Sequence, residues 1–250
     1  MKWTRYFSAL ATLGALGACA TAPLPPNPDP PPANEPEIVE PPPPAKQQPP
    51  PEPGLADQRI SIALVGDMML GTDFPDNHLP DDDGVSFLAN LTPVLSSADL
   101  AAGNLEGVLA DGGEPRKQCK NPRACYLFRS PTRYGALYQR AGFDMLSVAN
   151  NHALDFGEEG RDSTMATLDA VGIHHSGREG EFASFQYAEM RIAFLAYAVT
   201  RNSNLVFDYE LVDKTVRGYA ANHDIVIVSF HAGAEGQAYT NLPFAEEEYY

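Results

Sequence analysis

Between residues 60 and 231, short apolar segments of the strand type alternate with segments of helical periodicity. Residues 60–65, 143–148 and 224–230 are strand-like, and the last of these is a near-continuous apolar run of the kind that is buried in a sheet. Residues 158–171 carry apolar side chains along one side of a helix. This alternation predicts an α/β fold.

The other predicted elements continue the pattern. They are strands at residues 98–102, 173–175, 182–189 and 191–198, and helices at residues 86–97, 131–142 and 206–220. The helix at 86–97 is expected to bury one face, made of Phe87, Leu91, Val94 and Leu95. The last two strands listed are expected to form a hairpin around Glu189 and Met190.

Polar side chains gather where the predicted strands end. Asp67, Asn104-Leu105-Glu106 and Asn150-Asn151-His152 follow three of the strands, and His231 closes a fourth. Ligands of open α/β sheets bind outside the carboxyl ends of the strands. Carboxylate, amide and imidazole groups converging there would suit divalent metal ions and hydrolytic chemistry.

Each of these residues also has an ordinary structural explanation. Asp67 could turn the end of a strand, Glu106 could be a surface acid between two glycines, and His231 could be a buried structural histidine. His152 could be exposed in an asparagine-rich turn, or it could donate a proton near neutral pH. Asp155 could orient the His152 imidazole or cap the following helix.

The N-terminal region has the layout of an export signal. In residues 1–18, Lys2 and Arg5 precede a short apolar run, and Leu-Gly-Ala comes directly before Cys19. This sequence resembles a bacterial lipobox, which predicts lipidation of Cys19; the alternative is an ordinary signal peptide with an incidental cysteine. Residues 19–54 hold 16 of the 23 prolines and are expected to be an extended tether, or a proline-rich ligand for a partner.

Residues 55–250 are expected to form one domain. The chain has a formal net charge of −16, most of it on this domain, which argues against sequence-independent binding to nucleic acid. In an exported protein, Cys119 and Cys125 are expected to form a disulfide; a metal site is the weaker alternative. Around this pair lies a basic cluster that could contact an anionic polymer or be solvated: Arg116, Lys117, Lys120, Arg123, Arg129 and Arg133.

Three motifs give the sequence a specific resemblance. They are Val-Gly-Asp-Met-Met-Leu-Gly at 65–71, Gly-Asn-Leu-Glu at 103–106 and Ala-Asn-Asn-His-Ala-Leu-Asp-Phe-Gly-Glu-Glu-Gly at 149–160. Together with residues 167–177 and 224–235, they resemble the poly-γ-glutamate capsule-synthesis protein family of the CapA type. The resemblance covers about residues 58–250. That family is related to the calcineurin-like metallophosphatases, so the resemblance implies two β-sheets packed together, flanked by helices, around a two-metal centre.

The resemblance also implies roles for individual residues. Asp67 would bind one metal, Glu106 would bridge, Asn151 would bind the second metal, and His231 would be a further ligand. His152 would be the proton donor. The expected cofactor is one or two divalent ions, with Mn, Zn, Fe and Mg all open.

Two departures from the family pattern accompany the match. Met69 stands where the phosphatases have a histidine, and the family's Gly-His-His-Pro-His segment does not occur. The domain is therefore expected to be incomplete at its C-terminus, as a fragment of a longer protein; the alternative is a defective copy. The expected function is that of an exported lipoprotein of capsule or poly-γ-glutamate synthesis, in the cell envelope and outside the cytoplasm, with a metallophosphoesterase-like site. Where the host has an outer membrane, that is the expected destination. The alternative is a non-catalytic envelope scaffold or transport component that binds anionic polymer or partner proteins.

Overall fold

The computed structural model describes residues 59–119, 125–234 and 239. The predicted signal at 1–18, Cys19 and the tether at 19–54 lie outside the described residues, as do Lys120 and Arg123 of the basic cluster.

The first sheet consists of four parallel strands in the order β1-β2-β5-β6. These strands are β1 (Ile62–Met68), β2 (Leu100–Leu105), β5 (Met145–Ser147) and β6 (His174–Ser176). Because all four run in the same direction, their carboxyl ends share one edge of the sheet. A separate parallel pair, β3 (Val108–Leu109) with β4 (Arg129–Ser130), was not predicted.

The second sheet has the order β7-β8-β9, with β7 (Ala183–Tyr187), β8 (Met190–Ala198) and β9 (Ile225–His231). Strands β7 and β8 form the predicted hairpin, and β9 pairs with β8 in parallel. Tyr187 pairs with Met190, which places the turn at Ala188 and Glu189, one residue earlier than predicted. Ala188 takes the left-handed conformation there, with φ of 49°.

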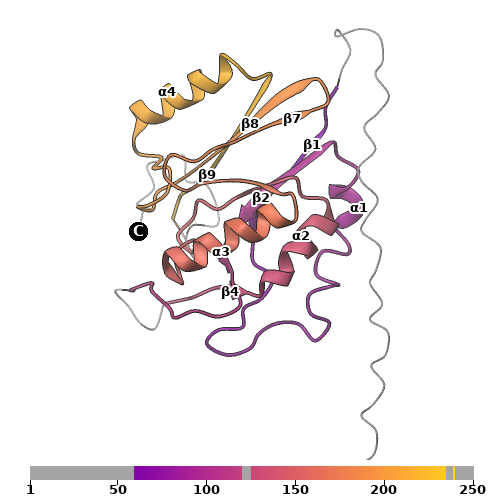
Figure 1. The fold of residues 1–250 in the computed structure, drawn as a ribbon, viewed down its shortest axis with the longest axis vertical. Helices are drawn as coiled ribbons and strands as arrows, with labels where there is room; N and C mark the ends of the chain where they lie inside the picture. Colours follow the sequence, from indigo (N-terminus) through magenta and orange to yellow (C-terminus); the bar gives the residue numbers. More distant parts are fainter. Residues whose placement is uncertain (1–58, 120–124, 235–238, 240–250) are drawn as a thin grey trace, which may run out of the picture. The chain divides into compact units, whose positions relative to one another are not determined.

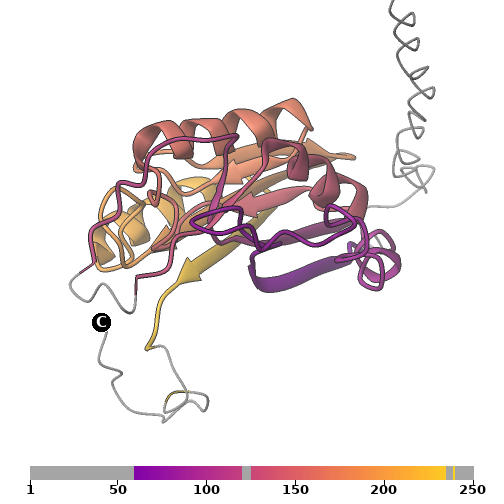
Figure 2. The same cartoon turned by 90° about the horizontal axis from the view of Figure 1, so that it is seen from below.

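The two sheets pack against each other. Leu100 and Met145 from the first sheet lie in one buried cluster with Ile192 and Phe194 from the second. Helices cover the outer faces, as Figures 1 and 2 show. Helices α1 (Thr92–Leu95), α2 (Gly135–Ala141) and α3 (Gly157–Ala170) contribute to the core over the first sheet, and α4 (Tyr209–Ala220) packs on β8. The predicted α/β fold of two sheets flanked by helices is confirmed.

The predicted helix at residues 86–97 is wrong for most of its length. Only α1 is helical, and the residues before it form a succession of turns. Pro93 explains the difference, because proline removes a backbone donor, clashes with the preceding turn and disfavours helical geometry at the residue before it. The expected face changes as a result: Leu88 and Leu95 are buried, whereas Phe87, Leu91 and Val94 are exposed.

The other helices agree with prediction apart from their ends. The segment after Pro131 begins as a 3-10 helix, η3 (Thr132–Tyr134), and continues as α2 until Gly142, where φ is 100°. Such a positive φ is the usual way for a helix to end on glycine. None of the helices in residues 59–119 and 125–234 has both the length and the apolar character that crossing a bilayer requires.

Candidate functional site at the strand ends

A bulge in β1 sets the direction of the Asp67 side chain. Leu64 pairs with Ala102 and Asp67 pairs with Asn104, so two residues of β1 oppose Gly103 alone. A β-bulge of this kind re-aims the side chains that follow it. An added Cβ on Gly103 would lie 2.7 Å from side-chain atoms of Val65 and Met68, so glycine fits where the strands approach closely. Asp67 therefore lies within β1, whereas the sequence predicted that it follows the strand.

Asp67 meets His231 at the junction of the two sheets. The side-chain amide of Asn104 donates to Asp67 Oδ1 at 2.8 Å, and His231 Nδ1 lies 3.2 Å from the same oxygen. Since β1 and β9 belong to different sheets, this contact exists only because the carboxyl ends of the facing sheets lie together. The hydrogen bond with His231, helped by Asn104, holds the pKa of Asp67 below its usual range, although burial acts in the opposite direction.

Glu106 and Asn151 complete the predicted ligand group. One ligand atom each from Asp67, Glu106 and His231 lie within 4.8 Å of one another. Asn151 Oδ1 lies 3.1 Å from His231 Nε2, and Glu106 Oε1 lies 3.8 Å from the same nitrogen. All four residues predicted as metal ligands are therefore close together.

The donor types of this group fit a divalent metal ion. Two carboxylates, one imidazole and one amide oxygen make a mixed set of the kind that binds Mn, Zn, Fe or Mg, and it does not single out one of them. Met69, the departure from the family pattern noted in the sequence, accepts a hydrogen bond from the Gly71 N–H on its sulfur at 3.1 Å.

His152 forms a tight pair with Asp155 beside the ligand group. His152 Nδ1 lies 2.7 Å from Asp155 Oδ2, and the Asp155 side chain is 0% exposed. The backbone N–H of Phe128 donates to the same carboxylate oxygen at 2.7 Å, and the Phe128 ring stacks on the imidazole at 4.2 Å. His152 Nε2 points toward Glu106 Oε1, 3.8 Å away. Of the two predicted roles for Asp155, the geometry agrees with orienting the imidazole.

Four further residues shape this site and were absent from the predicted ligand and catalytic sets. Asn150 donates to Asn104 Oδ1 at 3.1 Å and to the Leu105 carbonyl at 2.8 Å, and its own oxygen accepts from the His152 backbone at 3.0 Å. Asn104 and Asn150 thus hold the strand ends in register; their place in the strand-end clusters was the signal that could have identified them. Phe128 had no such signal.

Lys117 is the fourth, and it reaches the His152–Asp155 pair from the disulfide loop. Its Nζ atom lies 3.2 Å from Asp155 Oδ1 and 3.2 Å from His152 Nδ1. The predicted disulfide between Cys119 and Cys125 is present in the structure. In the sequence, Lys117 was grouped with other cations of the basic cluster, and nothing in its local pattern indicated a contact with His152.

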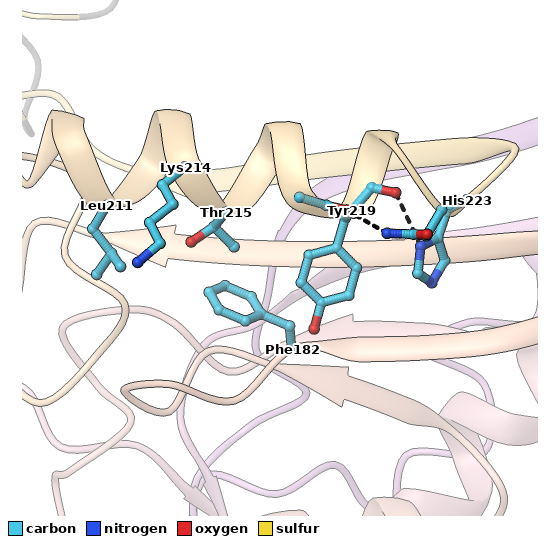
Figure 3. A pocket seen from close by; sticks show the side chains of 8 residues that line it. Phe182, Leu211, Lys214, Thr215, Tyr219 and His223 are labelled. Atoms are coloured by element: carbon cyan, nitrogen blue, oxygen red, sulfur yellow. Dashed lines mark hydrogen bonds between the residues drawn. The ribbon is translucent and has the colours of Figure 1, made fainter.

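A separate hollow of about 410 Å³ lies beneath α4. Figure 3 shows Leu211, Lys214, Thr215 and Tyr219 on the helix, facing Phe182. None of the predicted ligand or catalytic residues lines it. The hollow is largely apolar and lacks the converging carboxylate and imidazole groups found at the strand ends, so the strand-end cluster is the better candidate site.

The fold and the site define an α/β protein of two packed sheets whose ligand-type side chains meet at the carboxyl ends of the strands. The sequence profile of the family "Bacterial capsule synthesis protein PGA_cap" matches residues 61–243, and the chain belongs to this family. The family resemblance seen in the sequence is thereby confirmed.

Individual relatives agree with this assignment at low identity. The chain is 24% identical over 217 residues to the capsule biosynthesis protein CapA of Bacillus anthracis, covering 77% of this chain and 50% of that protein. It is 25% identical over 205 residues to the PGA biosynthesis protein CapA of Bacillus subtilis, covering 75% and 52%. The chain thus spans about half the length of these curated relatives.

Two solved structures are also similar. One is a hypothetical protein from Thermus thermophilus, with a TM-score of 0.42 and 17% identity, over 70% of this chain and 59% of that one. The other is a putative 5'-nucleotidase from Staphylococcus aureus in complex with alpha-ketoglutarate, with a TM-score of 0.42 and 14% identity, over 71% and 38%.

Proposed function

We propose that this chain is a cell-envelope protein of capsule or poly-γ-glutamate synthesis whose strand-end cluster binds one or two divalent metal ions for phosphoesterase-like chemistry. The observation that carries the proposal is the approach of Asp67, Glu106 and His231 within 4.8 Å, next to the His152–Asp155 pair. A bound metal would supply Lewis-acid activation of a phosphoryl oxygen.

The chain's own groups would orient the substrate and handle a proton. His152 donates its Nδ1–H to the buried Asp155 carboxylate, which fixes the imidazole as in other histidine–carboxylate pairs. The opposite nitrogen, Nε2, faces Glu106 and hence the ligand group, so a proton on Nε2 could pass to a leaving oxygen held there. The stacked Phe128 ring limits access of water to the imidazole.

Hydrolysis of p-nitrophenyl phosphate and bis(p-nitrophenyl) phosphate by the full chain, with each of the four candidate metals, tests this proposal. His152→Ala is expected to lower kcat by about 10²- to 10⁴-fold, the usual contribution of a general acid. His175→Ala is the matched control, because His175 lies on β6 and contacts Asp169 instead of the site. Equal loss in both variants, or none in His152→Ala, would refute the role of His152.

Export and lipid anchoring are a separate part of the proposal. The support is the charged start, the apolar run and the Leu-Gly-Ala sequence before Cys19. The anchor at Cys19 and the tether at residues 19–54 would hold the domain near a membrane surface outside the cytoplasm, in the outer membrane of a host that has one. Labelling with radioactive palmitate is expected for the wild-type chain and not for Cys19→Ser; labelling of both would contradict lipidation at Cys19.

The scaffold alternative depends on the basic cluster, but part of that cluster forms ion pairs with carboxylates of the same domain. Arg129 pairs with Asp73 at 2.6 Å, and Arg133 pairs with Asp83 at 2.6 Å. Because these cations already have carboxylate partners, they offer less charge to an anionic polymer than the sequence indicated, and the catalytic proposal is preferred.

A further inference from the structure

Lys117 is held against the candidate site by its own backbone. The N–H groups of Arg116 and Lys117 both donate to the carbonyl of Asp155, at 2.8 Å and 3.2 Å. Two residues later, Cys119 forms the disulfide with Cys125. The loop is therefore tied to the residue that orients His152, and its position is reinforced by a covalent link.

The ammonium group of Lys117 lies close to both ring nitrogens of His152, and its 3.2 Å distance to Nδ1 is the shorter of the two. Lys117 Nζ lies 3.5 Å from His152 Nε2, the nitrogen that faces Glu106. It cannot donate to Nδ1, because Nδ1 already donates its hydrogen to Asp155 Oδ2. An ammonium has three N–H donors, and Asp155 Oδ1 is its carboxylate counter-ion at 3.2 Å. The side chain is 23% exposed, so solvent or a ligand can reach it.

We propose that Lys117 recognises an oxyanion of the substrate, a phosphoryl or a carboxylate group, on the His152 side of the site. This inference rests on the proposed function. An anion approaching the site meets the carboxylates of Asp67, Glu106 and Asp155 on a chain of net charge −16. A lysine beside Nε2 offsets this repulsion as a compact point charge, a use of lysine that is common in phosphate sites.

A purely structural role for Lys117, as counter-ion to the buried Asp155, makes a different prediction. That role would affect stability and leave anion affinity unchanged. Lys117→Gln removes the charge, whereas Lys117→Arg keeps it and can still reach Asp155. Lys214→Gln is the matched control, because Lys214 lies on α4 at the separate hollow.

The test is calorimetric titration of inorganic phosphate, and separately of glutarate, into the full chain with and without stoichiometric Mn²⁺. Lys117→Gln is expected to weaken anion binding about tenfold or more, as loss of a charge-assisted hydrogen bond does. Lys117→Arg and Lys214→Gln are expected to bind as the wild type does. Binding of phosphate alone identifies a phosphoryl source of the oxyanion, and binding of glutarate alone identifies a carboxylate source.

The proposal is overturned if the wild type binds neither anion, or if Lys117→Gln binds both with unchanged affinity. Should Lys117→Gln fail to fold, Lys117→Met is titrated instead, because it keeps an unbranched side chain and removes the charge. Weaker anion binding by that variant supports the proposal, and unchanged binding overturns it. Metal content measured on the same samples tests the proposed metal site separately from the proposed role of Lys117.

Discussion

Gly177 lies where the end of β6 meets the segment that carries the candidate site. Its φ is +145°, and an added Cβ would lie 2.4 Å from the backbone nitrogen of Ala149 and 2.7 Å from the carbonyl carbon of Val148. These neighbours are backbone atoms, so they cannot give way by rotating a side chain. Ala149 is followed directly by Asn150-Asn151-His152, and Gly177→Ala must therefore displace the chain that positions these residues.

Two costs add in Gly177→Ala. Holding a residue other than glycine in this region of φ costs on the order of 1–3 kcal/mol, and forcing an extra carbon into a packed region costs about 1–3 kcal/mol more. The expected loss of unfolding free energy is roughly 2–6 kcal/mol, a large part of the 5–15 kcal/mol or so that is typical of a domain. Gly180→Ala is the control, with φ of +79° and nothing within 4 Å of the added Cβ. It is expected to lose only about 1–2 kcal/mol.

Urea unfolding of the full chain, followed by circular dichroism, measures both losses. At temperatures where Gly177→Ala remains folded, its divalent-metal affinity is also expected to fall, because Asn151 moves with the displaced backbone. Gly180→Ala is expected to keep that affinity. The reasoning is refuted if the two variants unfold within about 0.5 kcal/mol of each other, which is the range of ordinary surface substitutions.

The remaining predictions concern single polar contacts. Thr164→Val leaves the buried N–H of Leu109 without its 2.8 Å acceptor and is expected to lower the free energy of unfolding in urea by about 1–3 kcal/mol. Thr167→Val loses only a hydrogen bond within its own helix and should lower it less. Equal losses in the two variants would contradict this reasoning. Asp155→Asn is expected to lower the free energy of unfolding by about 1–3 kcal/mol, because Lys117 loses its carboxylate partner. An unchanged urea midpoint would argue against a stabilising Lys117–Asp155 ion pair. The pKa of Asp67 is lowered by His231, so its contribution to stability is complete above the unfolded-state pKa of about 3.9 and is lost as pH falls through the lowered value. Asp67→Asn should flatten this acid limb below about pH 5, and an unaltered limb would contradict the assignment.

The sequence was sufficient for those elements whose signal is local. The apolar run at 224–230 and the periodic segment at 158–171 became β9 and α3 within one residue at each end. The helix at 86–97 failed because a favourable apolar spacing was given more weight than Pro93, whose steric effect prevails in the structure. The short pair β3–β4 has only two residues per strand, too few for an alternating pattern to be recognised.

Much of the candidate site could be predicted because parallel strands bring their carboxyl ends to one edge. Asp67, Glu106 and Asn151 meet for that reason, and His231 joins them because the second sheet ends at the same place. Contacts that depend on loops could not be predicted. Lys117 reaches His152 through a loop whose path is set by the Asp155 carbonyl and a disulfide, and this information is tertiary.

Metal content of the full chain, measured by elemental analysis after dialysis, tests the central claim most directly. The account predicts about one or two divalent ions per wild-type chain, and a clear loss in Asp67→Asn and in His231→Ala. Asp213→Asn, which changes an exposed carboxylate paired with Arg217 on α4, should retain the wild-type content. A wild-type chain that holds no metal, or variants that hold as much as the wild type, would contradict the assignment of this cluster as a metal site.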